Sequence, residues 1–262
     1  MLPIRSLSPA IAKSLRGICF DIDDTVTRHG RLESSAYQAL FALREAGLKL
    51  LAITGRPLGF AEVIARMWPV DAAVGENGGG FVARHGAGLR FGYWDDAATR
   101  LAQATQLSIL RARVARELPH VNVSSDGWAR RCDLAFDVGE EVQLPGADVD
   151  RLVAIIESEG ARATVSSVHA HAQLGQHDKA KGAALAAREL WQLAPETLRD
   201  SFLFVGDSGN DAAAFAWFTH TAGVANVTRF LDRLPVPPRY VARAECGAGF
   251  TEIAQTVLEL RG

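Results

Sequence analysis

The sequence has little of several features that would assign it to a specialised class of protein. Its 262 residues include only three cysteines (Cys19, Cys132 and Cys246), too few and too widely spaced for a disulfide framework or a zinc site. The formal net charge is -2, so no overall basic field attracts nucleic acid or an anionic membrane. No internal repeat or low-complexity segment is present.

Long hydrophobic runs are missing as well. No segment reaches the roughly 20 continuous apolar residues of a membrane span. Arg5, Lys13 and Arg16 interrupt the N-terminal stretch in which a secretory signal would lie. We therefore expect a cytoplasmic protein that binds neither membrane nor nucleic acid, and the sequence leaves its oligomeric state open. Hydrophobic residues make up 48% of the chain, enough for one large or two modest cores.

The most informative segment that is present is an acidic cluster, Asp21, Asp23 and Asp24. It follows the uncharged segment 17–20, which is typical of a strand buried on both faces. Alternate side chains of an extended strand share a face, so Asp21 and Asp23 point the same way. Carboxylates this close need a counter-ion, and the carboxyl end of a parallel strand is where open α/β sheets bind ligands.

Three further segments complete a pattern. A strand over 48–54 ends in Thr54-Gly55, basic residues in 177–182 precede a helix, and a strand over 201–205 ends in Gly206-Asp207-x-x-Asn210-Asp211. Together with Asp21-x-Asp23-x-Thr25, these segments resemble the four motifs of the haloacid dehalogenase superfamily of phosphohydrolases. The loop Gly75-Glu76-Asn77-Gly78 is similar to one in the class IIB (Cof-like) branch, which carries a large C2-type cap.

The order of the expected elements predicts an α/β fold. Helices expected over 35–46, 57–67, 182–192, 211–217 and 250–260 alternate with strands over 48–54, 72–74 and 201–205. Such alternation implies right-handed crossovers and a parallel sheet. We expect a Rossmann-like, doubly wound core built from residues 1–83 and 178–262.

The spacing of the motifs locates an insert. Asp21 and Thr54 are 33 residues apart, enough for one crossover, whereas Thr54 and Lys179 are 125 residues apart. We therefore expect an inserted α+β cap domain over 84–177. Its expected elements are helices over 97–117 and 149–159, strands over 121–124 and 134–138, and either a strand pair or one bent strand over 163–174.

The resemblance implies roles for the acidic residues. Asp21 would be the nucleophile that forms an aspartyl-phosphate, and Asp23 would be the general acid and then the general base. The metal would be Mg²⁺, held by the carboxylates of Asp21 and Asp207 and by the backbone carbonyl of Asp23. Asn210 would face the phosphate or a metal-bound water, and Asp211 would support the lysine from the second shell.

The remaining motif residues would bind the phosphate. The Thr54 hydroxyl would donate to a phosphoryl oxygen, and Gly55 would permit a close backbone approach. A lysine would stabilise the charge of nucleophile and phosphoryl group. The family places this lysine just before a glycine and a helix, in a slightly variable register; we favour Lys179, with Lys181 as the alternative.

Other residues are weaker candidates. Asp24 stands where the family commonly has glycine, and we expect no catalytic role for it. Arg56 would reach substrate or cap its strand, and Glu76 with Asn77 would line the mouth of the site. The pair His169 and His171 would lie on a cap strand. A turn containing Trp128, Arg130 and Arg131 is expected to be solvated rather than to bind the leaving group.

The sequence thus predicts a Mg²⁺-dependent phosphatase of a small phosphorylated metabolite, for example a sugar phosphate. Two alternatives stay open at this point. A sugar phosphomutase would use the same acids, and a catalytically idle binding protein could keep the same fold.

Overall fold

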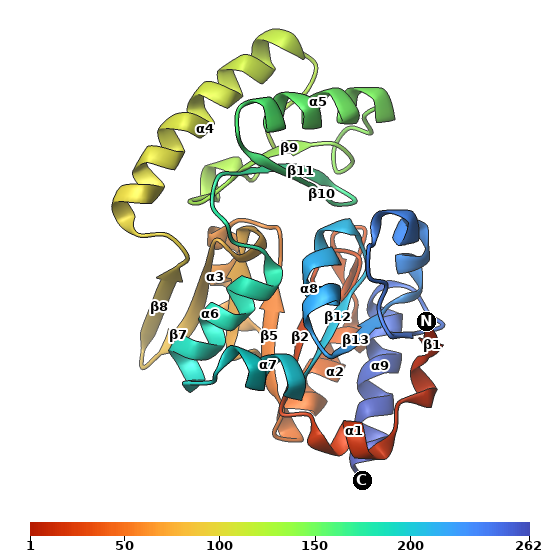
Figure 1. Cartoon of the computed structure of the whole chain (residues 1–262). Helices are drawn as coiled ribbons and strands as arrows, with labels where there is room; N and C mark the ends of the chain where they lie inside the picture. The colour runs from red at the N-terminus through yellow and green to blue at the C-terminus, as the bar shows by residue number, and fades with distance from the viewer.

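A mostly parallel β-sheet forms the centre of the molecule (Figure 1). The computed structural model describes the backbone of residues 1–262 and every side chain except that of Arg233, and over this range the sheet has nine strands. In spatial order they are β1 (Leu2–Pro3), β14 (Tyr240–Val241), β13 (His220–Gly223), β12 (Phe202–Gly206), β2 (Gly17–Phe20), β5 (Lys49–Ile53), β6 (Ala72–Gly75), β7 (Gly80–His85) and β8 (Gly88–Tyr93). All neighbours pair in parallel except β6–β7 and β7–β8.

The strand order reverses direction at β2. The chain adds β5 and β6 on one side of β2, and β12, β13 and β14 on the other. Open α/β sheets bind ligands at the carboxyl ends of the strands that flank such a switch point. Here those ends carry Asp21 and Asp207, and the N–H of Asp21 donates to the carbonyl of Val205 at 2.9 Å.

Helices cover both faces of this sheet (Figure 1). One face packs on α1 (Pro9–Ser14), α2 (Ser34–Glu45), α3 (Leu58–Met67) and α9 (Cys246–Arg261), and the other on α6 (Lys179–Trp191), α7 (Pro195–Ser201) and α8 (Ala212–Trp217). Ile18 and Phe20 belong to the first core, whereas Cys19 belongs to the second. This alternation is the period of a strand buried on both faces. The predicted α/β fold class with a doubly wound sheet is confirmed.

A second, smaller layer lies over the carboxyl ends of the parallel strands (Figure 1). It consists of an antiparallel sheet in the order β10 (Arg162–Val165), β11 (His169–Gln173), β9 (Leu134–Asp137), covered on its outer side by α4 (Ala97–Glu117) and α5 (Gly146–Ser158). Residues such as Val114, Phe136 and Ile156 form a separate hydrophobic core between sheet and helices. We call residues 94–177 the cap.

The boundary of the cap differs from the expected start at residue 84. That position lies inside β7, and β8 also pairs in the large sheet. The alternation of helices and strands that predicts a parallel sheet does not extend to the antiparallel pair β7 and β8. The sequence therefore did not predict that this pair belongs to the large sheet. We propose that the cap, taken as a structural unit, begins after Tyr93.

Most expected elements are present, with local differences. The segment 163–174 forms two strands rather than one bent strand. The expected strand over 121–124 makes only a bridge between Val123 and Phe136, because the chain turns into the 3₁₀ segment η3 (Gly127–Ala129) soon after it. Helices α1 and α7 were not expected. Short elements complete the fold: β3 (Thr27–Arg28), β4 (Arg31–Leu32), η1 (Ile4–Ser6), η2 (Glu76–Gly78), η4 (Gly209–Asp211) and η5 (Ala225–Arg233).

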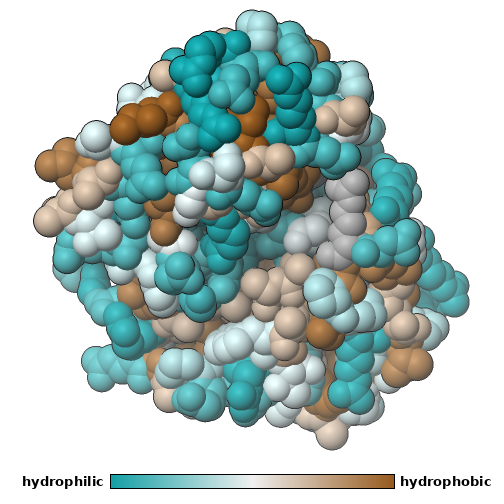
Figure 2. Space-filling view, turned by 45° about the horizontal axis from the view of Figure 1, so that its top comes forward, coloured by the Kyte–Doolittle hydropathy of each residue, from teal (hydrophilic) through white to brown (hydrophobic). Residues whose placement is uncertain are grey.

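The surface is predominantly polar. Hydrophilic side chains cover most of the face shown in Figure 2, and the hydrophobic ones are scattered among them. Among the described residues, none of the helices has the length and hydrophobicity needed to cross a membrane.

Helix α4 allows a matched test of the cap core. Leu110 is 1% exposed and Leu101 is 73% exposed on the same helix. Leu110→Ala should lower the free energy of unfolding by about 2–5 kcal/mol because it leaves a cavity. Leu101→Ala should change it by less than about 0.5 kcal/mol. Urea titration followed by circular dichroism measures both, and equal effects would contradict the separate cap core.

Candidate functional site

Two adjacent strand ends bring three buried carboxylates together. Asp21 follows β2, and Asp207 and Asp211 follow β12; all three side chains are buried. One oxygen from each lies within 4.8 Å of the others. The sequence motifs thus converge at the switch point, as the parallel topology requires.

Lys179 lies among these carboxylates. Its Nζ is 2.9 Å from Asp21 Oδ1 and 2.6 Å from Asp211 Oδ1, and it donates to Asn210 Oδ1 at 3.1 Å. Burial by itself would lower the pKa of Lys179, but Asp21 and Asp211 outweigh that effect and hold the pKa above its usual range. The ammonium group therefore stays charged.

Lys181 lies elsewhere. Its Nζ donates to the carbonyl of Gln176 at 2.6 Å and is 3.5 Å from Asp178 Oδ2, with nearly half of the side chain exposed. Asp178 caps helix α6 by accepting from the N–H of Lys181. Lys179 is the first residue of the helix, two residues before Lys181, so the two side chains lie on opposite sides of it. Of the two predicted alternatives, the structure brings only Lys179 to Asp21.

The balance of charge in this cluster is negative. Burial raises the pKa of Asp21 to about 7, and burial also raises the pKa of Asp207 well above its usual value, with the neighbouring carboxylates adding to both shifts. Three carboxylates face one ammonium, which is a donor set that suits a divalent cation with oxygen ligands. The buried acidic cluster of Asp21, Asp207 and Asp211 could therefore bind a metal.

Hydrogen bonds distinguish the acids within the cluster. Asp211 Oδ1 is engaged by Lys179, and its Oδ2 accepts the N–H groups of Asp207 and Ser208 at 2.8 and 3.0 Å. Asp211 therefore holds both the loop and the lysine. The backbone carbonyl of Asp23, the third predicted ligand, accepts no hydrogen bond from the described residues.

Asp207 is oriented by two side chains that were not predicted from the sequence to belong to the site. Thr25 Oγ1 donates to Asp207 Oδ1 at 3.2 Å, and Asn226 Nδ2 donates to Asp207 Oδ2 at 2.9 Å. Thr25 belongs to the first motif and could have been anticipated. Asn226 lies in η5 outside every motif, so only the fold reveals it.

Thr54 and Gly55 lie at the neighbouring strand end. Thr54 is fully buried, and its Oγ1 accepts from the N–H of Arg56 at 2.9 Å, which leaves the hydroxyl hydrogen free to donate. A side chain at Gly55 would come within 3.0 Å of His171 Nε2 and 3.2 Å of Asn77 Nδ2. The glycine therefore also allows the cap to approach closely.

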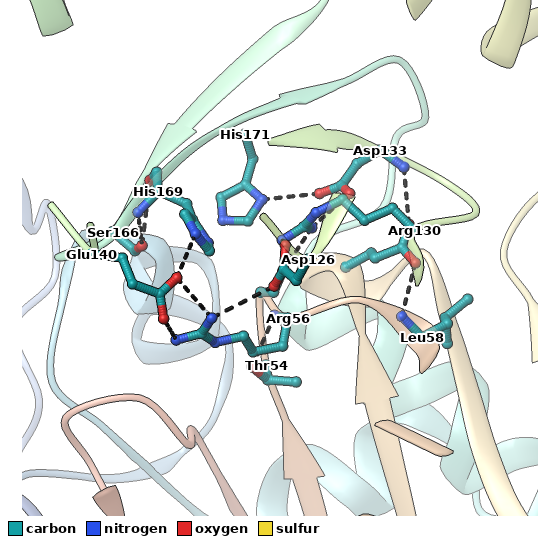
Figure 3. Close-up of polar contacts among 12 residues, drawn as sticks. Thr54, Arg56, Leu58, Asp126, Arg130, Asp133, Glu140, Ser166, His169 and His171 are labelled. Carbon is teal, nitrogen blue, oxygen red and sulfur yellow. Dashed lines mark hydrogen bonds and ion pairs between the residues drawn. The ribbon is translucent and has the colours of Figure 1, made fainter. Parts of the chain in front are cut away.

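Arg56 has a larger role in the structure than the sequence indicated, and Figure 3 shows its contacts with Glu140 and Asp126 of the cap. Its guanidinium binds Asp23 through Nε at 3.0 Å and Nη2 at 2.9 Å. The same guanidinium binds both oxygens of Glu140 in the cap, at 2.9 and 2.6 Å. The close contact with His169, and then Arg56, lower the pKa of Glu140 to about 2. Arg56 thus connects Asp23 to the cap through charged hydrogen bonds.

The two histidines lie on β11 and point into the site from the cap (Figure 3). His169 Nε2 is 2.9 Å from Glu140 Oε2, and His171 Nδ1 is 3.0 Å from Asp133 Oδ2. Burial lowers the pKa of His171 to about 4, so its ring is neutral near pH 7. Each ring has its own carboxylate partner.

The turn 126–133 was expected to be solvated, and this is wrong for one of its two arginines, Arg130. Trp128 is 89% exposed, but the side chain of Arg130 is buried. Arg130 Nη1 donates to the carbonyl of Gly55 at 3.0 Å and to Asp133 Oδ1 at 2.8 Å. This turn therefore docks the cap on the core.

Glu76 also joins cap and core rather than lining the mouth of the site. Its buried carboxylate accepts the N–H of Leu58 from the core and the N–H groups of Arg131, Cys132 and Asp133 from the cap. Burial raises the pKa of Glu76 to about 7, whereas these amide donors favour its ionised form.

Asp24 contributes a further contact with the cap. It has φ of +54°, the left-handed conformation that favours glycine, which accounts for the family's preference at this position. Its Oδ2 accepts from Ser167 Oγ at 3.0 Å. No catalytic role is needed to explain the residue.

Two cavities lie between cap and core. The one over Asp21 and Asp23 has a volume of only about 10 Å³ and is closed by cap residues such as His169 and His171. The second, of about 370 Å³, shares Asn210 with it and reaches Lys179. Its cap side is formed by β10 and β11, including Arg162, Thr164 and Gln173.

Comparisons with known proteins give a consistent result at the level of the fold. No family model and no curated protein matches the sequence. Among solved structures, a Thermoplasma acidophilum protein designated 0175 superposes with a TM-score of 0.72 at 20% identity, covering 94% of this chain and 99% of its own.

Two sugar phosphatases have the same architecture. The sucrose-phosphatase of Synechocystis superposes with a TM-score of 0.65 at 18% identity, covering 92% of this chain and 98% of its own. The subclass IIB sugar phosphatase BT4131 superposes with a TM-score of 0.59 at 17% identity, covering 94% and 99%. The chain therefore has the fold of the haloacid dehalogenase superfamily, in the form found in the subclass IIB phosphatase BT4131.

Proposed function

We propose that this protein is a Mg²⁺-dependent phosphatase that hydrolyses a small phosphorylated metabolite through an aspartyl-phosphate on Asp21. The observation that carries the proposal is the ion pair between Asp21 and Lys179 beside Asp207, at the switch point of the sheet. It supports the proposal because the carboxylates of Asp21 and Asp207 and the ammonium group of Lys179 share one buried site.

The donor set fits magnesium. The carboxylates of Asp21 and Asp207 and the backbone carbonyl of Asp23 would hold the ion, which would neutralise charge on the nucleophile and on the phosphoryl oxygens. Thr25 and Asn226 would keep Asp207 in position through the hydrogen bonds described above.

The chain's own residues supply the chemical steps. An oxygen of Asp21 attacks phosphorus while the bond to the leaving oxygen breaks, and protonated Asp23 transfers its proton to that oxygen. Asp23 then takes a proton from the water that attacks the phosphoryl group, which returns Asp21 and releases phosphate. Lys179, Thr54 with Gly55, and Asn210 would bind the phosphoryl oxygens, and Asp211 would hold Lys179.

The cap limits the size of the substrate. The cavity of about 370 Å³ beside Asn210 could accept a leaving group of sugar size, and its polar cap residues suit hydroxyl groups. With only about 10 Å³ directly over Asp21, the cap must open for a phosphate to enter. A phosphorylated sugar or a similar metabolite fits these limits, and a phosphoprotein does not.

The tight closure also favours one second candidate, a sugar phosphomutase, because a mutase must shield its phosphoenzyme from water. Incubation with a hexose 1-phosphate distinguishes the two: a phosphatase releases inorganic phosphate, and a mutase produces an isomer. A catalytically idle protein would release nothing from any phosphate ester, and the intact set of acids argues against it.

The nucleophile can be tested with its neighbour as the control. Asp21→Asn should abolish Mg²⁺-dependent phosphate release from p-nitrophenyl phosphate, because an amide cannot form the phosphoenzyme. Asp24→Asn should retain activity, since asparagine also tolerates the left-handed conformation found there. Chelation of divalent cations should abolish phosphate release by the native protein. Turnover by Asp21→Asn would reject the covalent mechanism.

The role of Asp23 can be tested by varying the leaving group. A p-nitrophenolate leaves without help from an acid, whereas an alkoxide does not. Asp23→Asn should therefore lower kcat/KM for an alkyl phosphate such as glycerol phosphate by about 10²- to 10⁴-fold and that for p-nitrophenyl phosphate by much less. An equal loss of kcat/KM on the two substrates would show that Asp23 is not the general acid.

The two lysines form another matched pair. Lys179→Ala should abolish phosphate release and lower the melting temperature, because it leaves buried carboxylates without their cation. Lys181→Ala should keep both properties near their native values. Phosphate assays and thermal unfolding measure the outcome, and full activity in Lys179→Ala would transfer the role to Lys181.

A further inference from the structure

A third cavity lies within the cap and has an unusual lining. It has a volume of about 210 Å³ and separates helix α4 from the segment 130–134. Four arginines line it, Arg100, Arg111, Arg130 and Arg131, together with a single carboxylate, Asp133. It shares no lining residue with the two cavities near Asp21, so it is a separate place on the molecule.

Of the four arginines, only Arg130 forms ion pairs with described carboxylates, those of Asp126 and Asp133. Asp133 is already engaged, with Oδ1 on Arg130 and Oδ2 on His171. Among the described side chains, no carboxylate lies within 4.0 Å of the guanidinium of Arg100, Arg111 or Arg131.

The nearby acids have other partners. Asp96 caps the start of α4 by accepting from the N–H of Thr99, and Asp95 accepts from Gln103 Nε2. Neither lines the cavity. The three arginines are therefore free to meet an anion from solution.

Two of the three arginines, Arg100 and Arg131, are held in place before any ligand binds. The guanidinium carbon of Arg100 is 3.6 Å from the centre of the Tyr93 ring, and that of Arg131 is 4.9 Å from the centre of the Phe91 ring. Arg131 Nη1 also donates to the hydroxyl of Tyr93 at 2.9 Å. Stacking on an aromatic ring uses the face of a guanidinium and leaves N–H donors in its plane.

The two walls of the cavity are also rigid. Arg100, Ala104, Leu107 and Arg111 follow the helical spacing that places residues on one face of α4. On the opposite wall, Glu76 accepts the backbone N–H groups of residues 131–133, which anchors that segment to the core. The backbone on both sides of the cavity is thus fixed by hydrogen bonds.

We propose that this cavity is a second binding site, specific for a small anion with at least two negative charges. Planar guanidinium groups pair with phosphate or carboxylate oxygens in two-point contacts, and several of them converge here. The volume suits a small metabolite and not a polymer. The site does not depend on the proposed phosphatase activity, since none of its residues takes part in the chemistry at Asp21.

The test follows the arginine side chains directly. In protein labelled with ¹⁵N at arginine Nε and free of Mg²⁺, pyrophosphate and citrate are titrated separately and the Nε–H signals are recorded by NMR. The signals of Arg100, Arg111 and Arg131, assigned by their loss in single variants, should shift together along one saturating curve. A response to pyrophosphate alone identifies a phosphate ligand, and one to citrate alone a carboxylate ligand.

Two variants of the same helix provide the comparison. Arg111→Gln should weaken binding at this site by about tenfold or more, because it removes a charge-assisted contact. Arg116→Gln removes the same charge from an exposed position outside the cavity and should leave the affinity unchanged. Asp21→Asn should also bind the anion normally, which separates this proposal from the catalytic one.

Three results would overturn the proposal. The first is the lack of any saturable shift at the three arginines. The second is an equal loss of affinity in Arg111→Gln and Arg116→Gln, which would indicate general screening of charge. The third is a response confined to Arg56, which would place the anion in the site over Asp21.

Discussion

The structure of the candidate site depends on one buried ammonium group among carboxylates. Lys179 lies against Asp21 and Asp211, with Asp207 beside them, and none of these groups can recover its hydration in the folded state. Removing only the ammonium group, or only a carboxylate paired with it, would leave an uncompensated buried charge, which costs several kcal/mol. The parallel sheet makes the cluster possible because β2 and β12 are neighbours and end at the same edge.

The interface between cap and core is built from polar contacts as well. Arg56 with Glu140, Glu76 with the amides of 131–133, Arg130 with Gly55, and Ser167 with Asp24 all cross it. Polar interfaces of this kind between parts of a chain permit relative motion more readily than apolar ones. That property suits a cap which leaves almost no space over Asp21 when it is closed.

Such contacts also link the cap to the residues around Asp21. The guanidinium of Arg56 binds Asp23 and Glu140 simultaneously, so closure of the cap and the orientation of Asp23 are connected by one side chain. His171 is held by Asp133, which is held by Arg130. Arg130 lines the arginine-rich cavity as well, so this chain of contacts reaches from that cavity to the site.

The sequence by itself determined the strand ends and the residues placed on them. An uncharged strand followed by Asp21 and Asp23, and another followed by Asp207 and Asp211, predict the sheet edge and its acidic site, because local patterns of polarity and turn residues set these features. The structure alone decided the partners that come from distant segments. Asn226, Glu140 and the docking of Glu76 carry no local signature, and β8 joins the large sheet against the predicted boundary. Local propensity cannot specify such contacts, since they depend on how separately formed elements pack around a common edge.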